Sequence, residues 1–174
     1  MRLLLDIMNE LRYKGYAIVM QEIPDEITLA LNICGCPYKC EGCHSKFLWD
    51  NDGEILNYDE LKKLLDKYGQ YITCVCFMGG DWNLPALLDL LVLIADYGLK
   101  TAIYSGSDEK KTFEALQKLY FDYIKMGSYQ AEKGGLDSIK TNQRLYVPVL
   151  QFKNGSSFSV KYIDITWKFW KPRL

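Results

Sequence analysis

The chain has 174 residues, of which 49% are hydrophobic and 25% are charged, and its formal net charge is −1. This length predicts one domain, residues 1–174, with enough apolar side chains for a single core. The charge gives no electrostatic reason to expect nucleic acid or an anionic membrane surface as a partner. The sequence also has no apolar run approaching the roughly 20 residues that cross a bilayer.

The first residues, MRLLLDIMNELRYKG, are not expected to be a signal peptide. They contain Asp6 and Glu10 and lack a small-residue cleavage site. A cytoplasmic location is therefore predicted. Six cysteines would stay reduced in that compartment, which favours metal binding over disulfides.

Apolar spacing and turn residues predict strands that alternate with helices. Strands are expected at residues 17–19, 27–33, 71–78, 100–104 and 121–126. Helices are expected at residues 58–68, 84–97 and 108–120, the first with Asn57 as its N-cap. Strands joined by helices pair in parallel through right-handed crossovers, so an α/β fold is expected.

Residues 144–152 and 158–166 are expected to form a C-terminal β-hairpin that turns at Asn154-Gly155. The strand–helix units before it are too few for an eight-stranded barrel. We therefore expect a partial (βα) barrel or an open curved, mostly parallel sheet, with the hairpin at its edge. Ligands bind at the carboxyl ends of such strands, where this chain places four glycines: Gly79, Gly80, Gly106 and Gly127.

Three cysteines, Cys36, Cys40 and Cys43, follow a CxxxCxxC spacing within one loop rich in glycine, proline and charge. Thiolates are soft ligands that suit iron–sulfur clusters and zinc. Three thiolates in one loop can occupy three corners of a four-iron cluster and leave the fourth iron open to a small molecule. Pro37 and Gly42 help the chain to wrap around a compact object.

A structural zinc site is the main alternative, with Cys34 or His44 as a fourth ligand. Such sites usually combine two ligand pairs from separate turns, so this spacing favours the iron–sulfur interpretation. Cys34 is otherwise expected to be a small buried hydrophobe. Cys74 and Cys76 share one face of a strand and are expected in the core, with an auxiliary metal role left open. A hydrolase that depends on His44 alone is a weak hypothesis.

Three segments together resemble a known family. The cluster loop GCPYKCEGCHSKFLWD, the turn FMGGD and the segment TNQRLY follow one another within roughly residues 16 to 147, after the strand-like QEIPDEITLALNICGC. They resemble the radical S-adenosylmethionine (radical SAM) superfamily, and more closely the anaerobic ribonucleoside-triphosphate reductase activating proteins, the activases of class III ribonucleotide reductase. Two positions depart from the pattern. Gly42 stands where the superfamily often has an aromatic residue near adenine, and Asp81 replaces a glutamate. Tyr38 or His44 is a candidate to replace the aromatic residue.

The resemblance implies a radical SAM oxidoreductase that binds a 4Fe-4S cluster through the three cysteines and S-adenosylmethionine at the open iron. The main chain of Gly79 and Gly80 would approach the methionine closely, and Asp81 would accept a hydrogen bond from its ammonium. Ser105 would contact the ribose or serve only as a turn residue. Lys125 would meet a carboxylate or be solvated.

The same resemblance implies reductive cleavage to methionine and a 5′-deoxyadenosyl radical, which takes hydrogen from a glycine of the class III reductase. A low-potential electron donor is the other expected partner, and a homodimer is considered. Asn142, Gln143 and Arg144 would line the site, hold the partner's loop or serve only as an edge strand. The aromatic tail with Trp167, Phe169 and Trp170 would dock a partner or pack on the sheet.

Two other functions stay open at this point. One is an activase of a different glycyl-radical enzyme, or another small radical SAM enzyme. The other is a zinc or iron–sulfur binding module without enzyme activity, which would have a closed set of four ligands.

Overall fold

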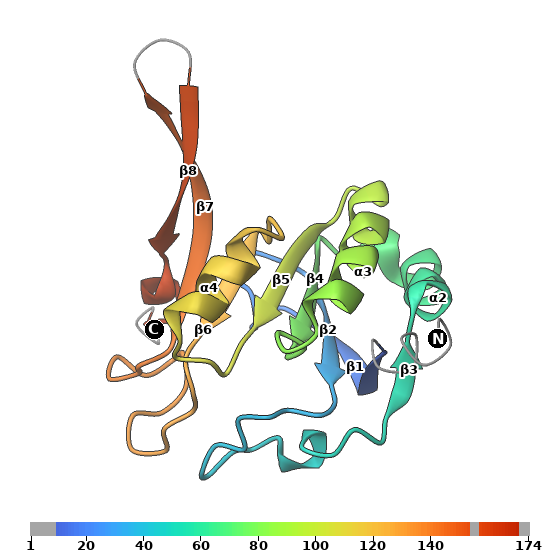
Figure 1. Cartoon of the computed structure of the whole chain (residues 1–174), viewed down its shortest axis with the longest axis horizontal. Coiled ribbons are helices and arrows are strands. Elements are labelled where there is room, and N and C mark those ends of the chain that lie inside the picture. Colours follow the sequence, from blue (N-terminus) through green and yellow to red (C-terminus); the bar gives the residue numbers. More distant parts are fainter. Residues whose placement is uncertain (1–9, 154–156, 171–174) are drawn as a thin grey trace.

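The computed structural model describes residues 10–153 and 157–170. One eight-stranded sheet runs through them in the order β3-β1-β2-β4-β5-β6-β7-β8 (Figure 1). The strands are β1 (Leu11–Val19), β2 (Thr28–Ile33), β3 (Glu54–Leu56), β4 (Cys74–Met78), β5 (Lys100–Tyr104), β6 (Tyr123–Met126), β7 (Arg144–Lys153) and β8 (Ser157–Asp164). The helices are α2 (Tyr58–Tyr68), α3 (Leu84–Asp96) and α4 (Lys110–Gln117), with short 3-10 turns η1 (Lys46–Leu48), η2 (Gly69–Tyr71) and η3 (Thr166–Trp170).

The sheet is mixed. Its four central strands, β2, β4, β5 and β6, are parallel, whereas β3 and β1 on one side and β7 and β8 on the other pair antiparallel. The parallel character expected from the sequence is thus confined to the centre. The parallel strands also place the carboxyl ends of β2, β4, β5 and β6 at one rim, where the loops that carry the candidate residues begin.

Strand β1 is longer than predicted, and β3 was not predicted at all. The antiparallel register between β1 and β2 shifts between Tyr13 and Tyr16, and Gly15 lies there with a φ of +75°. This bulge interrupts the alternation of apolar and polar residues that predicts a strand. Strand β3 has only three residues, too few for a pattern, and pairing with β1 defines it.

Helix α2 confirms its prediction residue for residue. The Asn57 side chain accepts a hydrogen bond from the main-chain N–H of Glu60 at 3.0 Å, which satisfies one of the free donors at the helix start. Leu61, Leu64 and Leu65 are the buried residues of the helix. Burial of this face against the sheet stabilises the helix more than propensity alone would.

The two faces of the sheet have separate cores. Helices α2, α3 and α4 cover one face (Figure 1), and Val75 and Phe77 of β4 belong to that core. Cys74 and Cys76 belong to the core of the other face, with Ile23 and Ile165. Both cysteines are fully buried, as predicted.

Strands β7 and β8 form an antiparallel hairpin whose register runs from Tyr146 opposite Asp164 to Lys153 opposite Ser157. The hairpin extends beyond the rest of the described chain (Figure 1). The turn predicted at Asn154-Gly155 lies outside the described residues, as do residues 1–9, where the absence of a signal peptide was predicted. Among the described helices, none has the length and apolar character needed to cross a bilayer.

Candidate functional site

The cysteine loop leaves the carboxyl end of β2 and folds back along itself. The main-chain N–H of Cys36 donates to the carbonyl of Leu48 at 3.0 Å, which ties the two arms of the loop together. Gly42 has a backbone φ of +72°, a conformation that residues with a Cβ rarely adopt. Cys36, Cys40 and Cys43 are all free thiols of intermediate exposure.

Main-chain donors reach two of these sulfurs. The N–H of Ser45 donates to Sγ of Cys43 at 3.3 Å. Burial raises the pKa of the Cys36 thiol, and hydrogen bonds from the main chain of Tyr38 and Lys39 work in the opposite direction. Such N–H donors stabilise thiolates and tune clusters ligated by thiolate.

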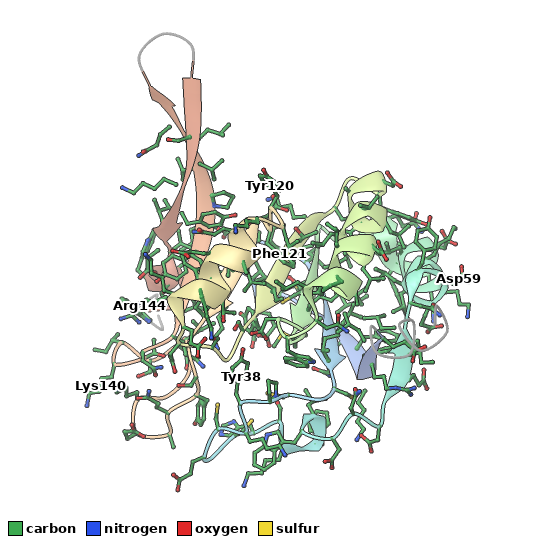
Figure 2. The ribbon with its side chains drawn as sticks, viewed as in Figure 1. Tyr38, Asp59, Tyr120, Phe121, Lys140 and Arg144 are labelled. Carbon is green, nitrogen blue, oxygen red and sulfur yellow. The ribbon has the colours of Figure 1, made fainter. Side chains whose placement is uncertain are left out.

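A pocket with a volume of about 150 Å³ lies between the cysteine loop and the carboxyl ends of the parallel strands. The loop side contributes Cys36, Tyr38 and Cys43, and the strand side contributes Gly79, Asp81 and Ser105 among others. Tyr38 lies between the loop and the sheet (Figure 2). With Gly106 and Lys125, which also line it, the tertiary structure thus gathers eight of the residues singled out in the sequence around one cavity.

Asp81 is the most informative residue of this pocket. It is 7% exposed, and only one of its two carboxylate oxygens has hydrogen-bond partners. Its Oδ2 accepts hydrogen bonds from the Tyr38 hydroxyl and from Oγ of Ser105, the latter at 2.7 Å. Its Oδ1 is buried and has no hydrogen-bond partner. Burial raises the pKa of Asp81, and the bonds from Tyr38 and Ser105 partly offset this. One acceptor is therefore left free for a donor in the pocket.

Ser105 and Lys125 complete the polar wall. Ser105 is fully buried, and its hydroxyl donates to Asp81 and accepts from the N–H of Ser107 at 3.0 Å. Lys125 is 7% exposed and also lines the pocket, so the interpretation as a solvated lysine is wrong. Its Nζ donates to the carbonyls of Ser105 at 3.3 Å and Gly127 at 2.7 Å. Burial lowers the pKa of Lys125 to about 8.

The two glycines after β4 have different surroundings. Gly79 lines the pocket and has a φ of +115°. A Cβ at Gly80 would instead face the core side chains of Leu11, Ile33 and Leu87. The structure therefore brings Gly79 to the site and leaves Gly80 behind it as a turn residue.

Four other candidates lie outside this pocket. His44 is exposed, and its Nε2 lies 3.4 Å from the Tyr129 hydroxyl. Gly42 lies near Ala131 and Tyr129, and Cys40 lines a neighbouring hollow with Tyr38. Cys34 is buried, as expected, and burial raises the pKa of its thiol.

Trp49 and Trp82 also line the pocket, although the sequence predicted no role for either side chain. Trp82 packs close to Gly79, where a Cβ would lie 3.0 Å from its ring. The buried Nε1 of Trp49 has no hydrogen-bond partner. Their positions directly after the cysteine loop and directly after Asp81 were the available signal, because aromatic side chains commonly wall off ligand pockets.

The donor set suits a thiolate-ligated cluster. Three soft sulfurs lie on one loop, two of them receive main-chain N–H donors, and two line a pocket that also holds an unsatisfied carboxylate oxygen. Within residues 10–153 and 157–170, no three cysteine, histidine or acidic side chains lie close enough together to hold a metal ion, and this includes Cys36, Cys40 and Cys43.

Residues 27–143 match the family model described as a 4Fe-4S single cluster domain. The chain belongs to this family. The match covers well over half of the chain, from the start of β2 through the cysteine loop and Asp81 to the segment before β7. Neither the curated proteins nor the solved structures contain a match to this chain. Family membership identifies an iron–sulfur protein and favours a 4Fe-4S cluster over the zinc alternative.

Proposed function

We propose that this iron–sulfur protein is a radical SAM enzyme whose cluster is held by Cys36, Cys40 and Cys43. The observation that carries the proposal is the unsatisfied Oδ1 of Asp81 in the pocket that Cys36 and Cys43 also line. A ligand that carries an ammonium group and also binds a cluster suits a pocket that combines a free carboxylate oxygen with two cysteines. The curved sheet with its parallel centre would then be a sheet of the radical SAM type.

The protein's residues have separable roles in this proposal. Oδ1 of Asp81 accepts from the ammonium of S-adenosylmethionine, while Tyr38 and Ser105 hold the other oxygen in place. Gly79 lets the ligand approach the main chain because no Cβ intervenes. Lys125, positioned by two carbonyls, places a positive charge beside the pocket and attracts the ligand's carboxylate.

Cys36, Cys40 and Cys43 would hold a four-iron cluster, and in its reduced form that cluster would supply the single electron that divides S-adenosylmethionine into methionine and a 5′-deoxyadenosyl radical. The chain's contribution is to orient the sulfonium and to keep water away from the radical. Tyr38, Trp49 and Trp82 wall the pocket for this purpose.

We propose a glycine of class III ribonucleoside-triphosphate reductase as the hydrogen donor. The resemblance of the cysteine loop, the Gly-Gly-Asp turn and the Asn-Gln-Arg segment to the activases supports this partner. A cytoplasmic location and a low-potential electron donor belong to the same proposal.

The side chains of Gln143 and Arg144 contact main-chain carbonyls of the chain itself. Nε2 of Gln143 lies 3.4 Å from the carbonyl of Gly127, and Nη1 of Arg144 donates to the carbonyl of Thr141 at 2.6 Å. These bonds favour the interpretation that the segment shapes the rim of the site. An activase of another glycyl-radical enzyme fits the same residues.

An electron-transfer module is the second candidate, favoured by the family match alone. The test that separates the two is anaerobic reconstitution with iron and sulfide, followed by dithionite and S-adenosylmethionine. We expect 5′-deoxyadenosine from the wild type and none from Cys36→Ala, Cys40→Ala or Cys43→Ala. A protein that binds one tight zinc ion, or a cluster that never cleaves S-adenosylmethionine, would contradict the enzyme proposal.

A further inference from the structure

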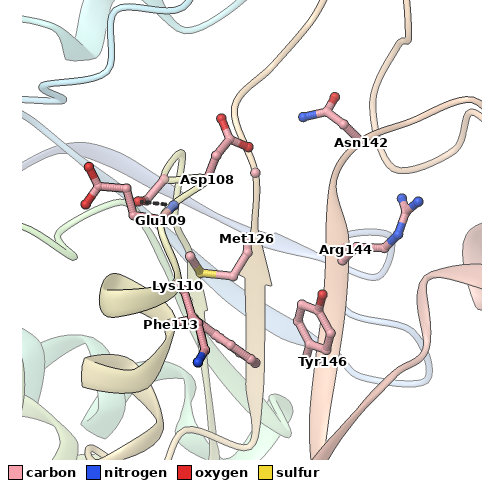
Figure 3. A pocket seen from close by; sticks show the side chains of 10 residues that line it. Asp108, Glu109, Lys110, Phe113, Met126, Asn142, Arg144 and Tyr146 are labelled. Carbon is pink, nitrogen blue, oxygen red and sulfur yellow. Dashed lines mark hydrogen bonds between the residues drawn. The ribbon is translucent and has the colours of Figure 1, made fainter.

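The β6–β7 loop, residues 127–143, lies between the cysteine loop and the C-terminal turn η3 (Figure 1). Its two ends are tied together at Ser128. The N–H of Ser128 donates to Oδ1 of Asp108 at 3.2 Å, and Nδ2 of Asn142 donates to the Ser128 carbonyl at 2.9 Å. Figure 3 shows Asp108 and Asn142 on either side of the chain that leaves β6. Because its ends are joined, the β6–β7 loop is a compact unit rather than a loose connection.

Further bonds hold the interior of the β6–β7 loop in shape. The main-chain N–H groups of Lys133 and Gly134 both donate to the carbonyl of Gln130 at 3.0 Å. Oγ1 of Thr141 lies 3.4 Å from the carbonyl of Gly134. Gly134 has a φ of +75°, and a Cβ there would lie 2.9 Å from Cβ of Ser138. A loop that is bonded across itself in this way can hold a neighbouring segment in a fixed position.

On one side, the β6–β7 loop contacts the cysteine loop beside the third cysteine. The rings of Tyr129 and His44 have centroids 5.2 Å apart, and the Tyr129 hydroxyl lies 3.4 Å from Nε2 of His44. A Cβ at Gly42 would lie 3.3 Å from Cβ of Ala131 and 3.7 Å from Cε1 of Tyr129. Gly42 and His44 are the two chain neighbours of Cys43. These contacts therefore act on the part of the cysteine loop that presents Cys43.

On the other side, the β6–β7 loop contacts the aromatic tail. The indole N–H of Trp170 donates to the carbonyl of Leu136 at 3.0 Å. Turn η3, which carries Trp170, is itself fixed to β7, because the fully buried Oγ1 of Thr166 accepts from the N–H of Leu145 at 2.9 Å. Trp170 thus connects the sheet to the β6–β7 loop, and the tail packs on the chain itself at this residue.

We propose that Tyr129 and Trp170 are positioning residues for the cluster. Trp170 fixes the β6–β7 loop, and Tyr129 holds the half of the cysteine loop that carries Cys40 and Cys43. Cys40 belongs to this half because it lines a hollow together with Tyr129. Contacts behind the ligands keep a metal site in its binding geometry, so a site that loses them binds its metal more weakly. The inference rests on the cysteine loop as the cluster site and not on any reaction.

Alkylation of the apo-protein tests this positioning without a cluster. Iodoacetamide labelling under reducing conditions, followed by mass spectrometry, gives a rate for each cysteine. We expect Tyr129→Ala and Trp170→Phe each to raise two of these rates by about threefold or more, because the cysteine loop opens more often. The two are the rates of Cys40 and Cys43. The rate of Cys36 should stay as in wild type, since its N–H is bonded to the opposite side of the cysteine loop.

Three further variants are matched controls. Trp167→Phe removes the same indole N–H from η3, but at a side chain that is 58% exposed. Tyr71→Ala removes an exposed tyrosine from η2. Tyr129→Phe keeps the ring beside Gly42. We expect all three to label at wild-type rates, and urea denaturation should give equal midpoints for every variant.

Loss of the reconstituted cluster to an iron chelator is the second readout. We expect the visible absorption to disappear about tenfold faster from Tyr129→Ala and Trp170→Phe than from the controls. The proposal is overturned if the three cysteines accelerate equally or not at all, or if Trp167→Phe behaves as Trp170→Phe does. If the expected rates are found but no protein cleaves S-adenosylmethionine, the proposed function fails and the positioning proposal stands.

Discussion

Two buried carboxylates lie at opposite ends of the parallel strands and differ in how many of their oxygens have hydrogen-bond partners. Glu26, at the amino ends, is 6% exposed and has three partners. Lys100 and Tyr123 donate to Oε1 at 2.5 and 2.6 Å, and Thr73 donates to Oε2 at 2.6 Å. Asp81, at the carboxyl ends, is buried to the same degree but leaves one oxygen without a partner.

The surroundings move the two pKa values in opposite directions. Burial acts to raise the pKa of Glu26, but the hydrogen bonds from Lys100, Thr73 and Tyr123 lower it overall. Burial raises the pKa of Asp81, and its two hydroxyl donors do not overcome that effect. The fold thus satisfies both oxygens of Glu26, whereas one oxygen of Asp81 is left for the proposed ligand.

The cysteines differ in the same way. Burial raises the pKa of Cys76 well above its ordinary value, so this thiol in the core stays protonated. Cys36 and Cys43 have intermediate exposure and receive main-chain N–H donors. Partial exposure and main-chain donors give Cys36 and Cys43 surroundings that suit metal ligands, whereas Cys76 has those of a core residue.

The largest expected effect is on iron content. Cys36→Ala, Cys40→Ala and Cys43→Ala should each lose nearly all of the reconstituted 4Fe-4S absorption, because each removes one of the three loop thiols and the neighbouring Cys34 is buried. Cys76→Ala should retain the iron and lose about 1 kcal/mol of unfolding free energy. Iron and sulfide analysis with visible spectroscopy measures the first effect, and urea denaturation measures the second. Equal iron loss in Cys76→Ala would contradict the distinction between the two sets.

The next effect is on stability. Glu26→Gln should lower the free energy of unfolding by about 2 kcal/mol, since Lys100 and two hydroxyls lose a charged acceptor. Asp81→Asn should change it by less than about 1 kcal/mol, because the cost of burying that charge disappears with the charge. Urea denaturation of the two variants at pH 7 under reducing conditions checks this. The reverse order would show that Asp81 is the structural carboxylate.

A third effect is on the pH dependence of stability. The folded-state pKa of Glu26 lies below its ordinary value of 4.5, so its contribution is present above pH 4.5 and is lost as the pH falls through the folded value. The folded-state pKa of Asp81 lies above 3.8, so its ionisation destabilises the fold and protonation on acidification relieves this. Urea midpoints between pH 3 and 7 should therefore fall less steeply for Glu26→Gln and more steeply for Asp81→Asn than for wild type.

The smallest expected effect concerns Tyr38. Tyr38→Phe keeps the ring against Gly106 but removes one hydrogen bond to Asp81, which raises the pKa of that carboxyl further. S-adenosylmethionine should bind about 3- to 10-fold more weakly, the equivalent of one hydrogen bond, with iron content unchanged. Anaerobic titration followed by electron paramagnetic resonance measures the affinity. An unchanged affinity would show that Asp81 does not depend on Tyr38.

Local sequence patterns were sufficient for several features of this protein. The CxxxCxxC spacing pointed to a cluster because all three ligands lie in one short loop. The residues of α2 and its Asn57 cap were predicted because apolar spacing and capping depend only on neighbours along the chain. The buried positions of Cys74 and Cys76 followed from the twofold period of a strand.

Only the tertiary structure decided which candidates meet. Asp81, Tyr38 and Ser105 come from three separate loops, and their shared hydrogen bonds require β2, β4 and β5 to be in register. The burial of Lys125 and the exposure of His44 depend on what packs against them, which no local pattern records. Pairing, burial and hydrogen bonding between distant segments are properties of the folded chain. For that reason the sequence predicted an iron–sulfur site, and the fold decided which residues surround it.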